Sequence, residues 1–85
     1  GYVEGPVRAR VIRIGERAKA EDLWGEEITL EERATARNIY GLHIYLEARS
    51  RVLGEVKYVE SLEAEEGVYL AKPPEKVEKP EDIGL

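Results

Sequence analysis

The sequence predicts a single small α+β domain built on a mainly antiparallel four-stranded sheet. From residue 42 to residue 52, apolar and polar side chains alternate without interruption, which is the period of a half-buried β-strand. Arranged at about 100° per residue, the same side chains leave no polar face, so the pattern disfavours a helix. Thr29 and Glu32 have the spacing of a capping box, which predicts one helix before that strand. With 85 residues, the chain can build one thin core.

The first half of the chain is expected to form a strand, a connector and the helix. The strand covers residues 7–14, between the turn signal Gly5-Pro6 and Gly15, and its apolar side switches near Val11, as at a β-bulge. Residues 16–28 form the connector, with a helical turn near residues 18–23, and carry the only tryptophan, Trp24. We expect Trp24 in the core, with an exposed anchor in a partner interface as the alternative. The helix covers residues 29–37.

The second half is expected to form a meander followed by a tail. Strands are predicted at residues 41–52, 55–62 and 67–71, separated by Gly54 and by a turn at residues 64–67. The folded domain therefore covers residues 1–72. After Pro73 and Pro74 the chain is rich in Glu, Lys and Pro, so residues 73–85 are predicted to form an extended acidic tail.

The composition excludes several kinds of chemistry. The chain has no cysteine, so it forms no disulfide, no thiolate zinc site and no thiol nucleophile. It also lacks methionine, and 36% of its residues are charged, which is typical of hyperthermophile proteins. No apolar stretch is long enough to span a membrane, and the N-terminal residues lack the layout of a signal peptide. We therefore expect a soluble, cytoplasmic protein from a thermophile.

No constellation of residues predicts an enzyme or a cofactor. His43, Tyr45 and Glu47 share one face of the predicted strand, but side chains two residues apart stand about 7 Å from each other. His43 therefore cannot be oriented by Glu47, and one histidine without cysteine is far short of a zinc site. Phosphate-binding glycine motifs are absent. The sequence predicts no catalytic residue, no metal and no small-molecule substrate.

Protein–protein interaction is the leading functional hypothesis. Residues 1–20 carry a charge of +3 and residues 54–85 a charge of −5, an asymmetry that can mark a partner surface. A chain this small also leaves a sheet face and edge strands uncovered. We expect a non-catalytic small subunit or adaptor that binds a protein partner or forms a homo-oligomer. The candidate contact residues are Trp24, Tyr45, Arg49, Arg51, Val77, Ile83 and Leu85.

Binding of RNA or single-stranded nucleic acid is the alternative hypothesis. It uses a stripe of arginines together with tyrosines that can stack on bases, and its candidate residues are Arg8, Arg10, Arg13, Arg49 and Arg51. A sequence pI near 5.0 favours the other interpretation of these arginines, as ion-pair partners of the 18 acidic residues.

Overall fold

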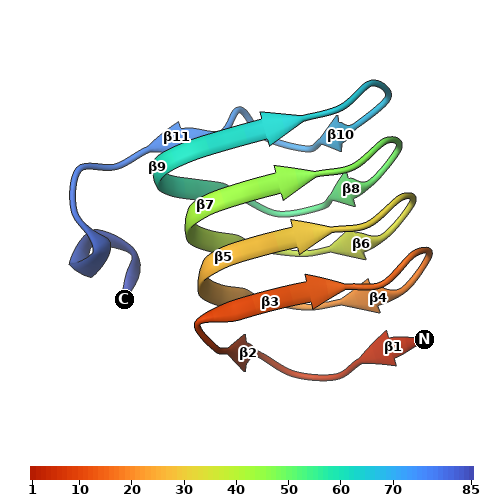
Figure 1. The fold of residues 1–85 in the computed structure, drawn as a ribbon, viewed down its shortest axis with the longest axis horizontal. Coiled ribbons are helices and arrows are strands. Elements are labelled where there is room, and N and C mark those ends of the chain that lie inside the picture. The colour runs from red at the N-terminus through yellow and green to blue at the C-terminus, as the bar shows by residue number, and fades with distance from the viewer.

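The chain folds as a parallel β-solenoid, in which successive coils stack on one another along one axis (Figure 1). The computed structural model describes all 85 residues. Val7, Leu23, Ile39 and Val56 are register partners and mark the starts of four coils, at residues 7, 23, 39 and 56. Every strand pair is parallel and no α-helix is present, so the predicted α+β class and antiparallel sheet are wrong.

Two parallel sheets form the walls of the solenoid. The long-strand sheet has the order β11 (Glu75–Lys76), β9 (Val56–Ala64), β7 (Ile39–Leu46), β5 (Leu23–Leu30) and β2 (Val7–Arg8), and β3 (Val11–Ile14) also pairs with β5. The short-strand sheet has the order β1 (Tyr2–Val3), β4 (Lys19–Ala20), β6 (Thr35–Ala36), β8 (Arg51–Val52) and β10 (Tyr69–Leu70). A single turn of 3₁₀ helix, η1, covers Pro80–Ile83. No helix of the structure is long and apolar enough to cross a membrane.

The core consists of apolar side chains stacked on their equivalents in the next coil. The inward positions of the long strands form two such stacks, and those of the short strands form a third: Ile12, Ile28 and Ile44; Ile14, Leu30 and Leu46; Ala20, Ala36 and Val52. All nine side chains are buried. The period-2 alternation of residues 44–46 therefore reports a real strand, although Leu42 faces outward and the strand ends at Leu46.

Equivalent turns join the long strands to the short ones. Arg17, Arg33 and Arg49 occupy the same turn position in three coils, with φ of 62°, 63° and 61°, and Gly67 takes this position in the fourth. In the second coil, the amide of Ala34 donates to the carbonyl of Glu31 at 3.0 Å.

This turn replaces the predicted helix over residues 29–37. The amide of Arg33 donates to the carbonyl of Ala48 in the next coil at 3.1 Å, and Thr29 continues β5. Pairing between coils thus overrides the local capping-box signal.

The other predicted strands and the connector also differ from the strands of the structure. The strand predicted at residues 7–14 is divided into β2 and β3, and Val11 points outward with half of its surface exposed. The predicted connector contains β4 and most of β5. The strand predicted at residues 41–52 turns a corner between β7 and β8, and those at 55–62 and 67–71 overlap β9 and β10. Their meander is wrong because each pairs with an equivalent strand one coil away.

The C-terminal segment lies along the outside of the solenoid (Figure 1). β11 pairs with β9, and the amide of Val77 donates to the carbonyl of Tyr58 at 2.8 Å. η1 then packs against β7 and β9 and buries Ile83. Beyond it, the carbonyl of Gly84 accepts a hydrogen bond from the Nη1 of Arg8 at 2.7 Å. The segment therefore connects the last coil to the first and does not extend freely into solvent.

We expect Ile83→Ala to lower the free energy of unfolding by about 2 kcal/mol, because a buried apolar side chain is truncated and leaves a cavity. Urea denaturation of both proteins measures the difference. The matched control is Glu81→Ala, an exposed position in the same helical turn, which should change stability by less than about 0.5 kcal/mol. Equal stability of Ile83→Ala and the parent chain would show that this segment does not brace the coils.

Candidate functional site

The fourth coil ends in an open strand edge. β9 pairs with β7 along its length, but on its other side only β11 pairs with it, at Lys57 and Tyr58. From Val59 to Ala64 no strand covers this second edge. An uncovered edge presents unpaired N–H and C=O groups and is a template for pairing with another strand.

An incompletely covered apolar layer lies beside this edge. Leu62, Ala64 and Leu70 continue the core stacks above Ile44, Leu46 and Val52. Leu62 and Leu70 are only half-buried and Ala64 is exposed, whereas the residues below them are buried. A further coil placed here would remove this apolar surface from water. We call the free edge of β9 and this apolar layer the open end.

The two ends of the solenoid carry opposite charges. Exposed acids cluster on the fourth coil: Glu60, Glu63, Glu65 and Glu66. Exposed bases cluster on the first: Arg8, Arg10, Arg13, Arg17 and Lys19. The charge asymmetry predicted along the sequence therefore becomes an asymmetry along the solenoid axis.

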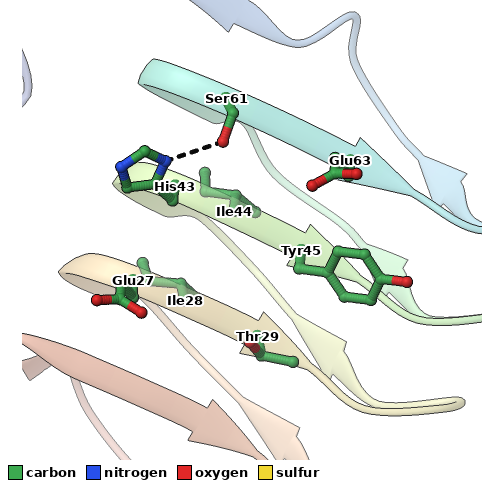
Figure 2. Close-up of a pocket in the computed structure, with 8 residues that line it drawn as sticks. All are labelled: Glu27, Ile28, Thr29, His43, Ile44, Tyr45, Ser61 and Glu63. Atoms are coloured by element: carbon green, nitrogen blue, oxygen red, sulfur yellow. Dashed lines mark hydrogen bonds between the residues drawn. The ribbon is translucent and has the colours of Figure 1, made fainter.

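A shallow hollow of about 120 Å³ lies on the outer face of the long-strand sheet (Figure 2). At its floor the Nδ1 of His43 and the hydroxyl of Ser61 are 3.0 Å apart, and Glu27 is the register neighbour of His43 on β5. Sequence reasoning could not find this pair, because Ser61 lies one coil away from His43 and becomes its neighbour only through the register. The nearest basic group to the Glu27 carboxylate is Arg10, at 3.9 Å. The two groups share a hydrogen bond whose direction depends on the imidazole tautomer, and no carboxylate hydrogen bond orients the exposed imidazole.

Tyr45 and Glu47, the other two residues of the predicted polar cluster, have partners on other coils. The hydroxyl of Tyr45 donates to the carboxylate of Glu65, which raises the pKa of Tyr45. Glu47 lies 3.7 Å from the guanidinium of Arg13, which also pairs with Glu31. His43, Tyr45 and Glu47 therefore do not converge on one point, and no group of three potential metal ligands is present.

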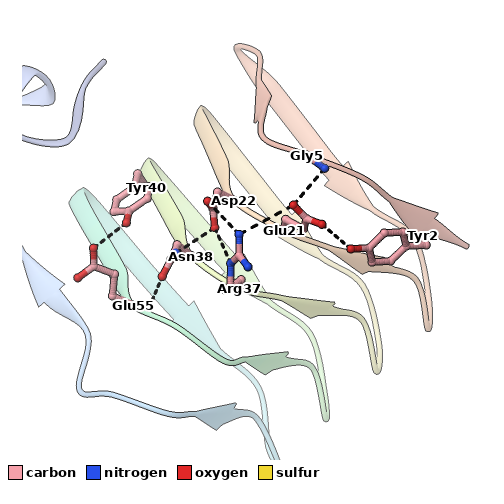
Figure 3. Close-up of polar contacts among 8 residues, drawn as sticks. All are labelled: Tyr2, Gly5, Glu21, Asp22, Arg37, Asn38, Tyr40 and Glu55. Carbon is pink, nitrogen blue, oxygen red and sulfur yellow. Dashed lines mark hydrogen bonds and ion pairs between the residues drawn. The ribbon is translucent and has the colours of Figure 1, made fainter.

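A ladder of polar side chains joins the coils at one corner (Figure 3). The Nδ2 of Asn38 donates to Asp22 at 2.9 Å, and the Oδ1 of Asn38 accepts from the amide of Glu55 at 2.8 Å. The hydroxyl of Tyr40 donates to the Glu55 carboxylate at 2.6 Å. One residue from each of three coils is thus linked in series, so this network stabilises the stack.

The corner network also shifts two pKa values. Burial, together with the hydrogen bond to Glu55, raises the pKa of Tyr40 to about 12. The hydrogen bond from the Arg37 guanidinium lowers the pKa of Asp22.

The predicted nucleic-acid residues fall into two groups. Arg10 lies near Glu27, and Arg13 pairs with Glu31, on the long-strand side. Arg49 and Arg51 lie at the short-strand sheet and have no carboxylate within 4.0 Å. The five arginines therefore do not form one stripe.

The predicted protein-binding residues are also dispersed. Trp24 is half-buried outside the core, stacked on Tyr40 at 4.9 Å between ring centroids, with the Arg8 guanidinium 5.2 Å from its ring. Ile83 is buried against the chain's own strands, and Val77 and Leu85 are half-buried. Tyr45 lies in the hollow, while Arg49 and Arg51 lie at the short-strand sheet.

Comparison with known proteins finds no family model that matches the chain, and neither a curated protein nor a solved structure that matches it at a significant level.

We expect stability to fall as pH rises from 10 towards 12, partly because of Tyr40. Its pKa is near 10.0 when unfolded and about 12 when folded, so in this window the unfolded state loses the proton first. The contribution of Tyr40 is complete below pH 10. Urea denaturation across this range should show a smaller fall for Tyr40→Phe than for the parent chain. An equal fall in both proteins would contradict the assignment.

Proposed function

We propose that this protein is a non-catalytic, self-associating module whose copies stack end to end through the open end of the solenoid. The observation that carries the proposal is the uncovered edge of β9 together with the exposed apolar layer beside it. The chain does not cover this edge itself, because after β11 it turns away and descends the outside towards Arg8 (Figure 1).

β3 of a second copy is the segment that fits the uncovered part of this edge, because β1 already covers β4 and β11 already covers Lys57 and Tyr58. β3 pairs only with β5, so within residues 1–85 its other edge is free to continue the parallel ladder. Ile12 and Ile14 would then stack over Leu62 and Ala64, as their equivalents do in every other coil. Bases of the first coil would face acids of the fourth, whereas contact between two open ends would oppose acid to acid.

The proposed contact implies a head-to-tail assembly. The two contacting surfaces differ, so the contact is heterologous and each added copy leaves a new open end. Because each coil is related to the next by translation along one axis, repeated stacking extends the solenoid into a filament rather than closing a ring.

Ala64→Lys tests the proposal. A lysine directed inwards at a sheet edge opposes strand addition, and Ala64 is exposed in the single chain, so the fold itself should tolerate the change. Sedimentation velocity of the parent chain should show mass increasing with concentration, and the variant should require at least about 10-fold higher concentration for the same mass.

The matched control is Ala71→Lys, which makes the same substitution at another exposed alanine of the fourth coil, outside β9. It should associate like the parent chain, and association should weaken as salt screens the opposed charges. A strictly monomeric parent chain at high concentration, or equal association of the Ala64→Lys and Ala71→Lys variants, would contradict the proposal.

A further inference from the structure

The outer face of the short-strand sheet is positively charged in a chain whose net charge is −5. In the first coil, residues 17, 19 and 21 alternate with inward-facing positions, so their side chains point outward. The equivalent residues of the second and third coils do the same. These outward positions hold six cations and one carboxylate: Arg17, Arg33, Arg49, Lys19, Arg51, Arg37 and Glu21. Other acids lie at the border of this surface: Glu16, Glu32 and Glu66 in the turns, and Glu4 directly after β1. We call this surface the basic face.

Most cations of the basic face have no acidic partner. Arg37 pairs with Asp22 at 3.2 Å, and Arg17 lies 4.0 Å from Glu16. Lys19, Arg33, Arg49 and Arg51 have no carboxylate within 4.0 Å. On the opposite face, by contrast, Arg13 is shared between Glu31 and Glu47. Arg33, Arg49 and Arg51 therefore remain available to an external anion, whereas two carboxylates already contact Arg13.

The arginine row is also unfavourable for the folded chain alone. Arg17, Arg33 and Arg49 hold positive φ, a conformation that costs an L-residue free energy and that Gly67 adopts freely in the fourth turn. Their backbones lie one strand spacing apart, about 4.8 Å, so three like charges stack along the axis. Neither local conformation nor ion pairing explains arginine at positions 33 and 49, whereas contact with a linear polyanion would.

An exposed aromatic side chain completes the surface. Tyr69 is the register partner of Arg51, at the end of the row that contains Lys19 and Thr35. Its side chain is 51% exposed, and the Arg51 guanidinium lies 5.9 Å from its ring. Cationic rows that follow a phosphate backbone, combined with a ring on which a base can stack, are the elements of single-strand recognition.

We infer that the basic face binds single-stranded nucleic acid, with Arg33, Arg49 and Arg51 contacting phosphates and Tyr69 stacking on a base. A second copy of this chain fits less well, because Glu31 and Glu47, two carboxylates of the long-strand side, already pair with Arg13. The inference does not depend on end-to-end stacking, since every residue it uses lies on the sides of the solenoid.

The test is fluorescence anisotropy of a short labelled single-stranded oligonucleotide. The parent chain should bind at about 50 mM salt and much more weakly at about 200 mM, because phosphate binding releases counterions. The double variant Arg33→Gly, Arg49→Gly should bind at least about 10-fold more weakly, and its plot of log affinity against log salt should be shallower by about 1.4. Glycine suits both positive φ values, so this variant should melt no lower than the parent chain.

The matched control is Arg10→Gln, Arg13→Gln, which removes the same charge from the long-strand side and should retain the parent affinity. Tyr69→Ala should weaken oligonucleotide binding about 5-fold or more but leave binding of heparin, a polyanion without bases, unchanged. Each of three results would overturn the inference: no binding at low salt, equal losses in the two double variants, or binding of heparin but not of the oligonucleotide.

Discussion

The whole structure depends on the parallel register that places each residue directly beside its equivalent in the next coil. Ile28 lies between Ile12 and Ile44, so its side chain packs against the coil on each side. Leu30 lies between Ile14 and Leu46 in the same way. The backbone follows the same rule, because the amide of each turn arginine donates to a carbonyl one coil further on. Stability in such a stack is largely a sum of similar contacts between neighbouring coils, to which the C-terminal segment adds a contact between the last coil and the first.

This register also explains the departures from regular repetition. Gly25 and Gly41 occupy equivalent inward positions, and a Cβ on Gly25 would lie 2.5 Å from the carbonyl oxygen of Ala9. The third coil contains an extra residue, and the side chain of Asn38 fills the resulting gap by bonding the amide of Glu55. A bulge in β9 then shifts the register opposite residues 41–43. Each irregularity is local, so the core stacks on either side of it continue.

Part of this fold could be predicted from the sequence, and the rest could not for a definite reason. Alternation identified a strand around Ile44 and Leu46, but a period of two is the same in parallel and antiparallel sheets. The capping-box spacing of Thr29 and Glu32 is a local signal, which the pairing between coils overrode. The informative signal was the recurrence of Glu-Arg-Ala at residues 16–18 and 32–34, continued as Ala-Arg-Ser at 48–50. That 16-residue period equals the length of a coil, but few other positions repeat identically, so the repeat is too weak to predict a solenoid from the sequence alone.

The surface features also differ in how well the sequence predicts them. Charge asymmetry along the chain was visible in the sequence because the coils are consecutive segments, so a difference between segments becomes a difference between ends. The basic face was not visible, because Arg17, Arg33 and Arg49 come from three coils and become neighbours only through the register. In a solenoid the inward side chains pack in the core, whereas the identity of the outward side chains is not restricted by that packing. On the short-strand sheet Arg33 and Arg49 stack like charges and have no carboxylate within 4.0 Å, so ion pairing within the chain does not account for arginine at these outward positions.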